Sequence, residues 1–476
     1  MGILYPWLYP ALSLLYLAVI AGCIAVVLSE NRNPIRALAW TIALIALPGV
    51  GLVFYLFFGR SLKGLHLISR HNKRRLMNNK RPHAAPLDDP CLNDTDRQLV
   101  KLAENLCRCP LSLNNHIDIF TDGRSKFEAL RRDLREARSS IYLQYYIFSD
   151  DALGREIADL LMEKARQGVR VKVIYDHVGS FSASRHFFRR MREAGVEAHP
   201  FFKVTFPQLA NRINWRNHRK IVIIDNATGY IGGMNIASRY VEGLPDGSAW
   251  RDTHFRVWGE IVESLLYSFA IDWNFLNPHP GFPPRNLPEN PIHNHLGMQF
   301  ISSGPVDQTG NISMCFLKAI ASARKRIYIQ TPYFLPTDTL MRALEVAAMA
   351  QVDVRVMMPR RPDSRMLRYA SFSYVTQCLR MGIKVYLYEA GMLHAKAMIV
   401  DDNLVTAGST NFDFRSFENN FEANLLIYDA GVNRRMRDIF FDDMKACRKL
   451  TLNDWRRRPL PQRLMESVVR LFSPIL

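Results

Sequence analysis

The sequence predicts an α/β protein made of two similar halves and preceded by a two-helix transmembrane hairpin. Three observations support this fold class. A motif of His, Lys, Asp, Gly and Asn occurs twice at the same spacing, and both halves alternate strands with helices of about ten to fifteen residues. Two uncharged runs of about twenty residues lie near the N-terminus. At 476 residues, the chain is long enough for more than one hydrophobic core.

The two uncharged runs, residues 8–28 and 37–58, are each long enough to cross a hydrocarbon core as a helix. We interpret residues 1–60 as a membrane hairpin. A cleavable signal peptide is the alternative for the first run, but this run lacks a basic n-region and an A-x-A-like site, and a second span follows it. Pro48, Gly49 and Gly51 are expected to kink the second helix or to let the helices approach closely.

The segment after the second run is strongly basic, with eight Lys or Arg and no acidic residue between positions 60 and 81. By the positive-inside rule this end, the N-terminus and the following domains are cytoplasmic, although Arg32 and Arg36 oppose this orientation. The segment could also rest on anionic headgroups, or act as a topology signal only. We expect residues 61–110 to form this basic segment and a linker with one helix near 94–107.

An internal repeat follows the linker. Residues 141–148 resemble residues 327–334, and in both places a helix and then a strand come next. The predicted helices are Gly154–Gln167 and Asp338–Ala350, and the predicted strands are Val169–Tyr175 and Val352–Met358. We therefore expect domains at 111–290 and 291–462, joined at a Pro-rich seam near 274–291. Residues 463–476 form an amphipathic tail that either touches the bilayer or packs on the protein's own surface.

The overall composition and net charge do not identify the binding partner. Lys and Arg exceed Asp and Glu by 62 to 44, and this net charge of +18 predicts an anionic partner, either nucleic acid or a lipid surface. The seven cysteines show no CxxC pair and no zinc spacing, so we expect reduced thiols in a cytosolic compartment and no metal site.

The duplicated motif contains the residues that can carry chemistry. They are His218, Lys220, Asp225 and Asn235 in the first copy and His394, Lys396, Asp401 and Asn411 in the second. The residues between Lys and Asp are rich in Ile and Val, which predicts a buried strand with His and Lys directed to one face. An imidazole, an ammonium and an amide together suit a phosphate. A two-step displacement needs two histidines, and each copy supplies one.

The two aspartates complete the catalytic motif, but their position favours another role. Asp225 and Asp401 each end the predicted strand and lie an odd number of residues from the histidine, on the opposite face. We therefore expect a structural part in the turn rather than catalysis.

The pattern HxKxxxxD followed by Gly and Asn resembles the signature of the phospholipase D superfamily, over most of residues 111–450. The resemblance implies two phospholipase D-like repeats related by a pseudo-two-fold axis, one shared active site, and no metal or cofactor. It implies a phosphohistidine intermediate with His218 as nucleophile and His394 as acid and base, although the sequence itself is symmetric on this point. The groups that would hold the phosphate oxygens are Lys220, Lys396, Asn235 and Asn411.

A nucleophilic imidazole also needs an acceptor on its far nitrogen. Asp252 and Glu422 each begin an apparent strand after one motif copy, and we expect them to pair crosswise with the two histidines. Glu418 is the rival to Glu422. His254 is expected to be structural, although it neighbours Asp252.

Within the superfamily, the membrane hairpin, residues 31–40, the basic segment and residues 411–422 resemble bacterial cardiolipin synthases. This implies phosphatidyl transfer between two phosphatidylglycerol molecules with release of glycerol, in a multi-pass protein of the bacterial inner membrane. Anionic membrane lipid is then the partner, without nucleic acid, and a homo-oligomer cannot be read from the sequence. The alternatives are a membrane-bound hydrolase of the phospholipase D type, another phosphatidyltransferase, a nuclease and a non-catalytic scaffold that binds anionic lipid.

Overall fold

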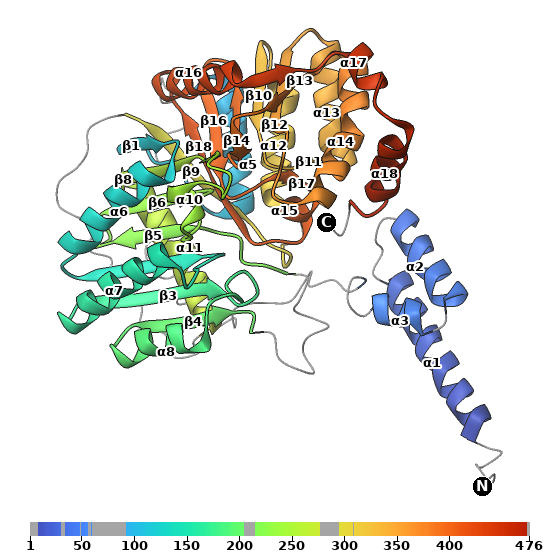
Figure 1. Ribbon diagram of the computed structural model, residues 1–476, viewed down its shortest axis with the longest axis horizontal. Helices are drawn as coiled ribbons and strands as arrows, with labels where there is room; N and C mark the ends of the chain where they lie inside the picture. The colour runs from blue at the N-terminus through green and yellow to red at the C-terminus, as the bar shows by residue number, and fades with distance from the viewer. Residues whose placement is uncertain are drawn as a thin grey trace. The chain divides into compact units, whose positions relative to one another are not determined.

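The structure is a computed structural model that describes residues 8–29, 34–47, 49–55, 59, 92–203, 215–276, 295–307 and 309–473. It consists of two compact units, one containing the N-terminal helices and one containing both repeats (Figure 1). The predicted basic segment at 60–81 and most of the seam at 274–291 lie outside the described residues.

The N-terminal unit is helical. Helix α1 (Leu8–Ser29) is, within the described residues, the helix that is long and apolar enough to cross a membrane. Helix α2 (Pro34–Ala46) packs with it through a small apolar cluster of Ile20, Val27, Leu44 and Tyr55. Helix α1 has no charged residue, whereas α2 contains Arg36 near its start. The contact between the two helices leaves most of the α1 surface exposed.

The second predicted helix, 37–58, is not continuous. Helix α2 ends at Ala46, and a separate short helix, α3, covers Val50–Phe54. Between them Gly49 has φ 76°, a conformation that favours glycine, and its N–H donates to the Tyr16 hydroxyl at 2.9 Å. Gly51 permits a close approach, because a Cβ there would lie 2.3 Å from the Ala43 carbonyl oxygen.

The first repeat contains a seven-stranded mixed sheet in the order β1-β8-β6-β5-β2-β3-β4. Strands β2, β3 and β4 are parallel, and the remaining neighbours are antiparallel. The strands are β1 (Asn115–Phe120), β2 (Ser140–Tyr145), β3 (Arg170–Asp176), β4 (Glu197–Phe201), β5 (Ile221–Ile224), β6 (Thr228–Gly232) and β8 (His254–Gly259). The helices are α6 (Gly123–Glu136), α7 (Ala152–Arg166), α8 (Arg185–Glu193), α10 (Arg239–Glu242) and α11 (Ile261–Leu276).

The second repeat contains an eight-stranded sheet with the same succession, β19-β13-β12-β10-β15-β16-β18-β9. The additional strand β19 (Cys447–Lys449) pairs with β13 at the edge. The other strands are β9 (Gly297–Ser303), β10 (Arg326–Gln330), β12 (Asp353–Pro359), β13 (Lys384–Tyr388), β15 (Ala397–Val400), β16 (Leu404–Gly408) and β18 (Glu422–Tyr428). The helices are α12 (Asn311–Ser322), α13 (Asp338–Met349), α14 (Arg365–Arg380), α15 (Phe414–Glu418), α16 (Ala430–Lys445), α17 (Leu452–Arg456) and α18 (Leu460–Arg470).

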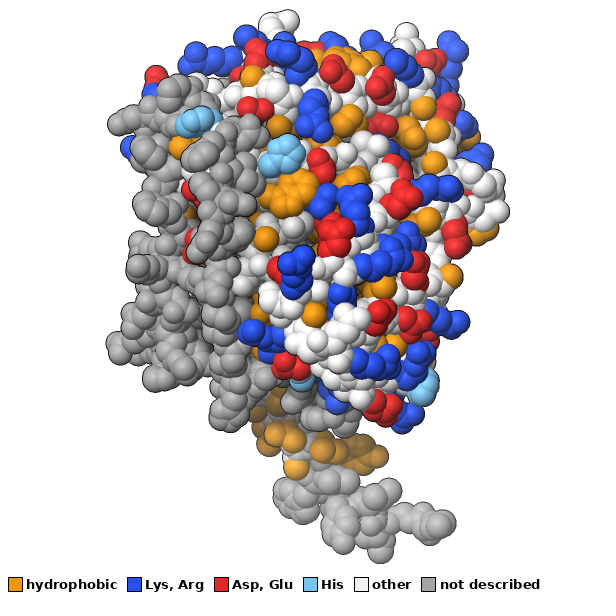
Figure 2. All heavy atoms as spheres, turned by 90° about the vertical axis from the view of Figure 1, so that its left-hand side faces the viewer, with side chains coloured by type: hydrophobic (Ala, Val, Ile, Leu, Met, Phe, Trp, Pro, Cys, Tyr) orange, Lys and Arg blue, Asp and Glu red, His pale blue; other side chains and the backbone are white. Residues whose placement is uncertain are grey.

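The repeated α/β architecture agrees with the expected fold class. Helices α7 and α13 and strands β3 and β12 begin and end within two residues of the predicted positions. Buried apolar side chains of each sheet and its helices form a core in each repeat. On the molecular face shown in Figure 2, Lys and Arg are interspersed with Asp and Glu, so the net positive charge is not concentrated there.

One helix of the predicted linker belongs to the second repeat. Helix α5 (Asp94–Cys107) is capped at its N-terminus by Asn93, whose side chain accepts a hydrogen bond from the Asp96 N–H. Its apolar residues Leu99, Val100 and Ala103 are buried in the second repeat's core, together with α12 and β9. Gln299 of β9 also donates to the Val100 carbonyl oxygen at 3.1 Å. The chain thus contributes to its second core before it builds the first.

The predicted tail packs on the protein. Helix α18 begins at Leu460 and lies against α14, with Val469 and Glu466 buried. Its opposite face remains exposed. The structure therefore shows the packing alternative, and contact of the tail with the bilayer stays a prediction.

The packing of α5 can be tested by truncation of one side chain. Leu99→Ala should lower the free energy of unfolding by about 2 to 5 kcal/mol, because it leaves a cavity in the second core. Chemical denaturation of the detergent-solubilised chain measures the change. Lys101→Ala, on the exposed side of the same helix, is the control and should have little effect. Equal effects of both substitutions would contradict this placement of α5.

Candidate active site

Backbone pairing between the repeats brings the two motif copies together. Asn217 forms a parallel bridge with Phe421, and β14 (Gly391–Leu393) pairs in parallel with β7 (Ala249–Arg251). Consequently the residue before each motif histidine is paired with the residue before a carboxylate of the other repeat. The His218 N–H donates to the Phe421 carbonyl at 2.9 Å, and the His394 N–H donates to the Arg251 carbonyl at 2.6 Å.

His218 contacts a carboxylate from the second repeat. Its Nδ1 lies 3.0 and 3.1 Å from the two carboxylate oxygens of Glu422, the first residue of β18. Glu422 also accepts from the Ser409 hydroxyl at 2.5 Å and from the Asn420 amide at 3.2 Å. Glu418, the rival predicted from sequence, lies at the end of α15 and makes no such contact with His218.

His394 makes the reciprocal contact with the first repeat. Its Nδ1 lies 2.6 Å from Asp252 Oδ2, and the Thr253 N–H donates to the other oxygen at 2.7 Å. If Nδ1 carries the proton donated to the carboxylate, the Nε2 lone pair of each histidine is free. Burial lowers the pKa of both histidines to about 4 despite these carboxylates, with the motif lysines adding to the decrease.

The two motif lysines are buried cations. Lys220 Nζ donates to the His218 carbonyl at 2.5 Å, and Lys396 Nζ donates to the His394 carbonyl and lies 2.8 Å from His394 Nδ1. Within the described residues, neither ammonium lies within 4.0 Å of a carboxylate oxygen. Burial lowers the pKa of both, and the charge of Lys396 further lowers that of Lys220. Two buried ammoniums without an ion-pair partner make a site that favours an anion.

The motif asparagines are partly engaged in hydrogen bonds with other residues. Asn235 accepts from the Ile147 N–H at 3.1 Å and donates to the Tyr240 hydroxyl at 2.8 Å. Asn411 donates to Asp413, the N-cap of α15, at 3.0 Å. Each amide has a second N–H, so a role toward a phosphate stays a prediction.

Aspartates 225 and 401 lie at the opposite ends of their strands from the histidines. Asp225 accepts from the backbone N–H groups of Arg138, Ser139 and Ser140 at 2.7 to 2.9 Å. Asp401 does the same for Arg324, Lys325 and Arg326. Both have positive φ, 52° and 51°, as turn residues. Inclusion of these two residues in the catalytic set is therefore not supported by their contacts, which are those of a turn.

The two copies differ beside the carboxylates. A Cβ at Gly233 would lie 2.1 Å from Asp252 Oδ1, so the Asp252 carboxylate occupies the space that a side chain at position 233 would need. At the equivalent position, Ser409 donates to the longer Glu422. Gly233 of the first copy thus allows Asp252 to approach the backbone closely. From the sequence alone, Gly232-Gly233 could equally have served only to loosen the turn.

A second pair of carboxylates supports the site and was missed from sequence. Asp272 of α11 accepts from Arg219 at 2.6 Å and Gln144 at 2.5 Å. Asp443 of α16 accepts from Gln330 at 2.7 Å and forms an ion pair with Arg251 at 2.8 Å, across the repeats. The signal was present, because a glutamine recurs at 144 and 330 in the aligned segments.

His254 has no part in this arrangement. It is fully buried in β8, neither ring nitrogen has a hydrogen-bond partner among the described residues, and burial holds its pKa well below the usual value. These features fit the structural role expected for it. Among the described residues no cluster of three or more His, Cys, Asp or Glu side chains could hold a metal ion.

Comparisons with known proteins agree with this geometry. The chain matches a family described as "Cardiolipin synthase, PLD-like domain" at residues 130–246 and 316–444, one segment in each repeat. It is 36% identical over 477 residues to the major cardiolipin synthase of Bacillus subtilis, which covers 98% of this chain and 98% of the relative. The chain belongs to the cardiolipin synthase family of the phospholipase D superfamily.

Other matches agree with membership in the cardiolipin synthase family. The chain is 38% identical over 467 residues to cardiolipin synthase 2 of Bacillus anthracis, covering 96% of this chain and 90% of the relative. Residues 14–60 match a family described as "Phospholipase_D-nuclease N-terminal". The crystal structure of phosphatidylserine synthase from Haemophilus influenzae has the same fold, with a TM-score of 0.63, 16% identity, and coverage of 80% of this chain and 100% of that chain.

The resemblance predicted from the two motifs is thus confirmed, and these relatives support a phosphatidyltransferase of the cardiolipin synthase family acting on phospholipid. The apolar helix α1 fits association with a membrane.

The turn role of the aspartates predicts a separation of stability from activity. Asp225→Ala should lower the free energy of unfolding by about 1 to 3 kcal/mol, because three backbone N–H groups lose their acceptor. Asp225→Asn, which keeps one oxygen, should lose less. Phospholipid turnover per folded molecule should be retained in both, and a large loss of turnover in the Asn variant would restore a catalytic role.

The lowered histidine pKa values predict a pH dependence of stability. In the folded chain His218 and His394 titrate near pH 4, whereas unfolded histidine titrates near 6.5. Because the unfolded state binds more protons between these values, stability present at neutral pH is lost as the pH falls. From pH 7 to 5 the loss should be roughly 2 kcal/mol per histidine.

Denaturant unfolding at several pH values measures this dependence, and the double variant His218→Gln, His394→Gln should weaken it by roughly 3 to 4 kcal/mol over the same interval. An unchanged slope would mean that neither histidine has a lowered pKa.

Proposed function

We propose that the chain joins two phosphatidylglycerol molecules into cardiolipin and releases glycerol, through a phosphohistidine on His218. The observation that carries this proposal is the pair of buried lysines, Lys220 and Lys396, beside two histidine–carboxylate pairs. Neither lysine has a carboxylate partner in the described part of the chain. Substrate specificity for phosphatidylglycerol rests on the names of the full-length relatives.

The lysines suit the charge of a phosphodiester. A buried ammonium without a counterion is unfavourable, and a bound phosphate oxygen would relieve this cost for both lysines. A negative charge between them would also raise the pKa of the nearby histidines, so that one imidazole can hold a proton when substrate is bound. Binding of the phosphodiester therefore favours the protonated imidazole that its cleavage requires as the general acid.

The surroundings of the carboxylates support different roles for the histidines. Glu422 shares its charge among His218, Ser409 and Asn420. Among the described residues, Asp252 accepts from one donor besides His394, the Thr253 N–H, and it lies 2.6 Å from the His394 ring. A shorter contact to a less engaged carboxylate stabilises an imidazolium better. We therefore assign His394 as acid and base and His218 as the nucleophile.

Two displacements follow from these roles. His218 Nε2 attacks phosphorus, the bond from phosphorus to the headgroup glycerol oxygen breaks, and His394 gives its proton to the departing alkoxide. Neutral His394 then takes a proton from a headgroup hydroxyl of the second phosphatidylglycerol. That oxygen attacks phosphorus, the bond to His218 breaks, and cardiolipin forms with the original protonation restored. Throughout both steps, the proton on each Nδ1 stays on the imidazole and is donated to Glu422 or Asp252.

We also propose a multi-pass placement in the bacterial inner membrane with both repeats in the cytoplasm. Helix α2 alone has 13 residues, about 20 Å, which is shorter than a hydrocarbon core of about 30 Å. The second crossing would therefore need α2 and α3 together. The cations at positions 60–81 support a cytoplasmic end by the positive-inside rule.

The function is tested by mass spectrometry of the lipids that the purified full-length chain makes from phosphatidylglycerol alone. Cardiolipin and glycerol should appear in equal amounts, and phosphatidic acid as the main product would indicate a hydrolase instead. His218→Ala should lose about a thousandfold or more of the rate. His186→Ala, at an exposed histidine on α8, should keep it.

The division of labour is tested with a phosphatidyl ester of nitrophenol, a leaving group that needs no proton. His394→Ala should release one equivalent of nitrophenol in a burst and carry a phosphatidyl adduct on His218, because only the second step requires the base. His218→Ala should show no burst. The reverse pattern would exchange the two roles.

A further inference from the structure

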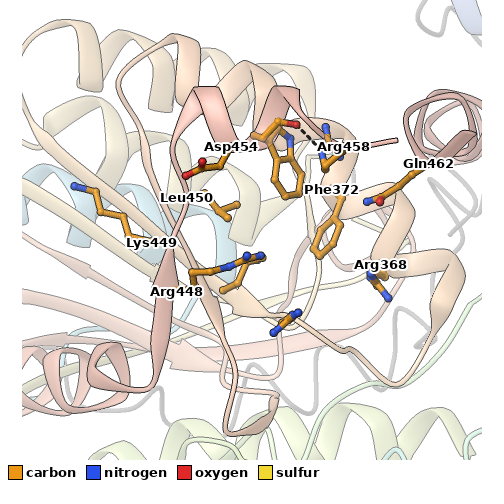
Figure 3. Close-up of a pocket in the computed structure, with 11 residues that line it drawn as sticks. Arg368, Phe372, Arg448, Lys449, Leu450, Asp454, Arg458 and Gln462 are labelled. Atoms are coloured by element: carbon orange, nitrogen blue, oxygen red, sulfur yellow. Dashed lines mark hydrogen bonds between the residues drawn. The ribbon is translucent and has the colours of Figure 1, made fainter. Parts of the chain in front are cut away.

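A second cationic site lies at the C-terminal end of the second repeat and includes none of the motif residues. A pocket of about 240 Å³ is enclosed by α14, β13, β19, α17 and α18 (Figure 3). Five cations line it, namely Arg360, Arg368, Arg448, Lys449 and Arg458. These cations come from two stretches of the chain, residues 360–368 and 448–458, so the fold itself brings their charges together.

Carboxylates balance the pocket only in part. Glu389 pairs with Arg360 at 2.9 Å and with Arg448 at 3.7 Å, and Glu466 pairs with Arg458. The third carboxylate, Asp454, accepts from the Thr451 hydroxyl at 2.7 Å. Five cations thus face three carboxylates, and the pocket retains a positive charge.

Arg368 is the cation without an ion pair. It comes from α14, and within the described part of the chain its guanidinium forms no salt bridge. Its Nε is buried and has no hydrogen-bond partner there. The guanidinium carbon of Arg368 lies 5.3 Å from the centre of the Phe372 ring. A buried donor of this kind is costly unless a ligand accepts from it.

Aromatic rings hold the guanidinium groups in place. Arg458 lies 3.6 Å from the centre of the Trp455 ring, and Trp455 meets Phe372 edge to face at 5.3 Å. The Phe372 ring positions the Arg368 guanidinium without neutralising it, whereas Arg458 is also paired with Glu466. Planar forks suit phosphate oxygens, which accept two parallel hydrogen bonds.

The exposed surface of helix α18 indicates which kind of phosphate compound could reach the pocket. Gln462 faces the pocket, and Glu466 and Val469 face the protein. The opposite side shows an apolar stripe at helical spacing, formed by Leu460, Leu464, Val468 and Leu471, which are 63, 59, 52 and 78% exposed. The exposed arginines around it are Arg456, Arg457, Arg463 and Arg470, and the one acidic residue of the helix, Glu466, is buried.

An exposed apolar stripe flanked by cations is typical of a helix that lies in the interface of an anionic bilayer. We propose that the arginine pocket binds the phosphate of an anionic phospholipid, with α18 as its wall toward the lipid, so that this corner is a docking site separate from the active site. The inference takes its lipid class from the proposed function but does not depend on the roles of the motif histidines.

A photoreactive phosphatidylglycerol tests the pocket. The full-length chain with His218→Ala, which prevents turnover, is reconstituted in phosphatidylcholine nanodiscs containing the probe, and labelled peptides are mapped by mass spectrometry. Peptides from 365–372 and 448–470 should be labelled. Arg368→Gln with Arg448→Gln should reduce this labelling about tenfold, because two phosphate contacts are lost. Labelling by a photoreactive phosphatidylcholine should be weak.

The matched control is Arg166→Gln with Arg170→Gln, which removes the same charge from exposed positions of the first repeat. It should leave the labelling unchanged. Equal loss in both variants, or equal labelling by the zwitterionic probe, would overturn the site. Loss of labelling on addition of inorganic phosphate at the concentration of the lipid would assign the pocket to a soluble phosphate instead.

The occupant of the stripe is tested with a photoreactive amino acid at Leu464 of the same full-length chain in nanodiscs. A lipid adduct is expected. A covalent dimer would show that a second copy covers the stripe and would overturn the membrane contact. Cardiolipin formation by Arg368→Gln, Arg448→Gln in detergent should match the unmodified chain, so a failed docking site and a failed catalytic assignment give different results.

Discussion

The active site depends on two short stretches of backbone pairing between the repeats. Asn217 with Phe421 and β14 with β7 are paired in parallel, each one residue before a histidine and a carboxylate. Side chains alternate along paired segments, so a shift of one residue would turn each carboxylate away from its histidine. Neither repeat can orient its own imidazole. The site therefore exists only where the two sheets are joined in this register.

The backbone pairing brings charged groups together, whereas the cost of burying those charges opposes their assembly. The pairing places two histidines and two lysines in a buried space, and burial lowers the pKa of all four. Buried carboxylates at 252 and 422 compensate in part. Burial alone would raise the pKa of each, but Lys396 and His394 lower that of Asp252, and His218 with Lys220 lowers that of Glu422. Packing between the repeats must hold this cluster together against the cost of burying its charges.

Much of the fold and of the active site could be predicted from the sequence because the motif occurs twice and the two copies can be compared with each other. The duplicated motif identified both histidines and lysines, and apolar runs located β5 and β15. Alternation along a strand separated Asp225 and Asp401 from the site. What could not be predicted depends on contacts between distant segments. The supporting pairs of Gln144 with Asp272 and Gln330 with Asp443 span more than a hundred residues each.

The predicted linker shows the same limit. Amphipathic periodicity located α5, but periodicity says nothing about which core a helix joins. The break between α2 and α3 likewise depends on the contacts of Gly49 and Gly51, although the glycines themselves suggested it.

The membership of α5 in the second core has a consequence for synthesis on the ribosome. Leu99 leaves the ribosome about 210 residues before its partner Ile312, an interval of about 10 to 40 s at typical elongation rates. During this time the first repeat can fold, while the apolar face of α5 has no place to bury itself. The newly made chain must keep this helix from aggregating until the second repeat emerges, and a nearby membrane surface or a chaperone could shield it.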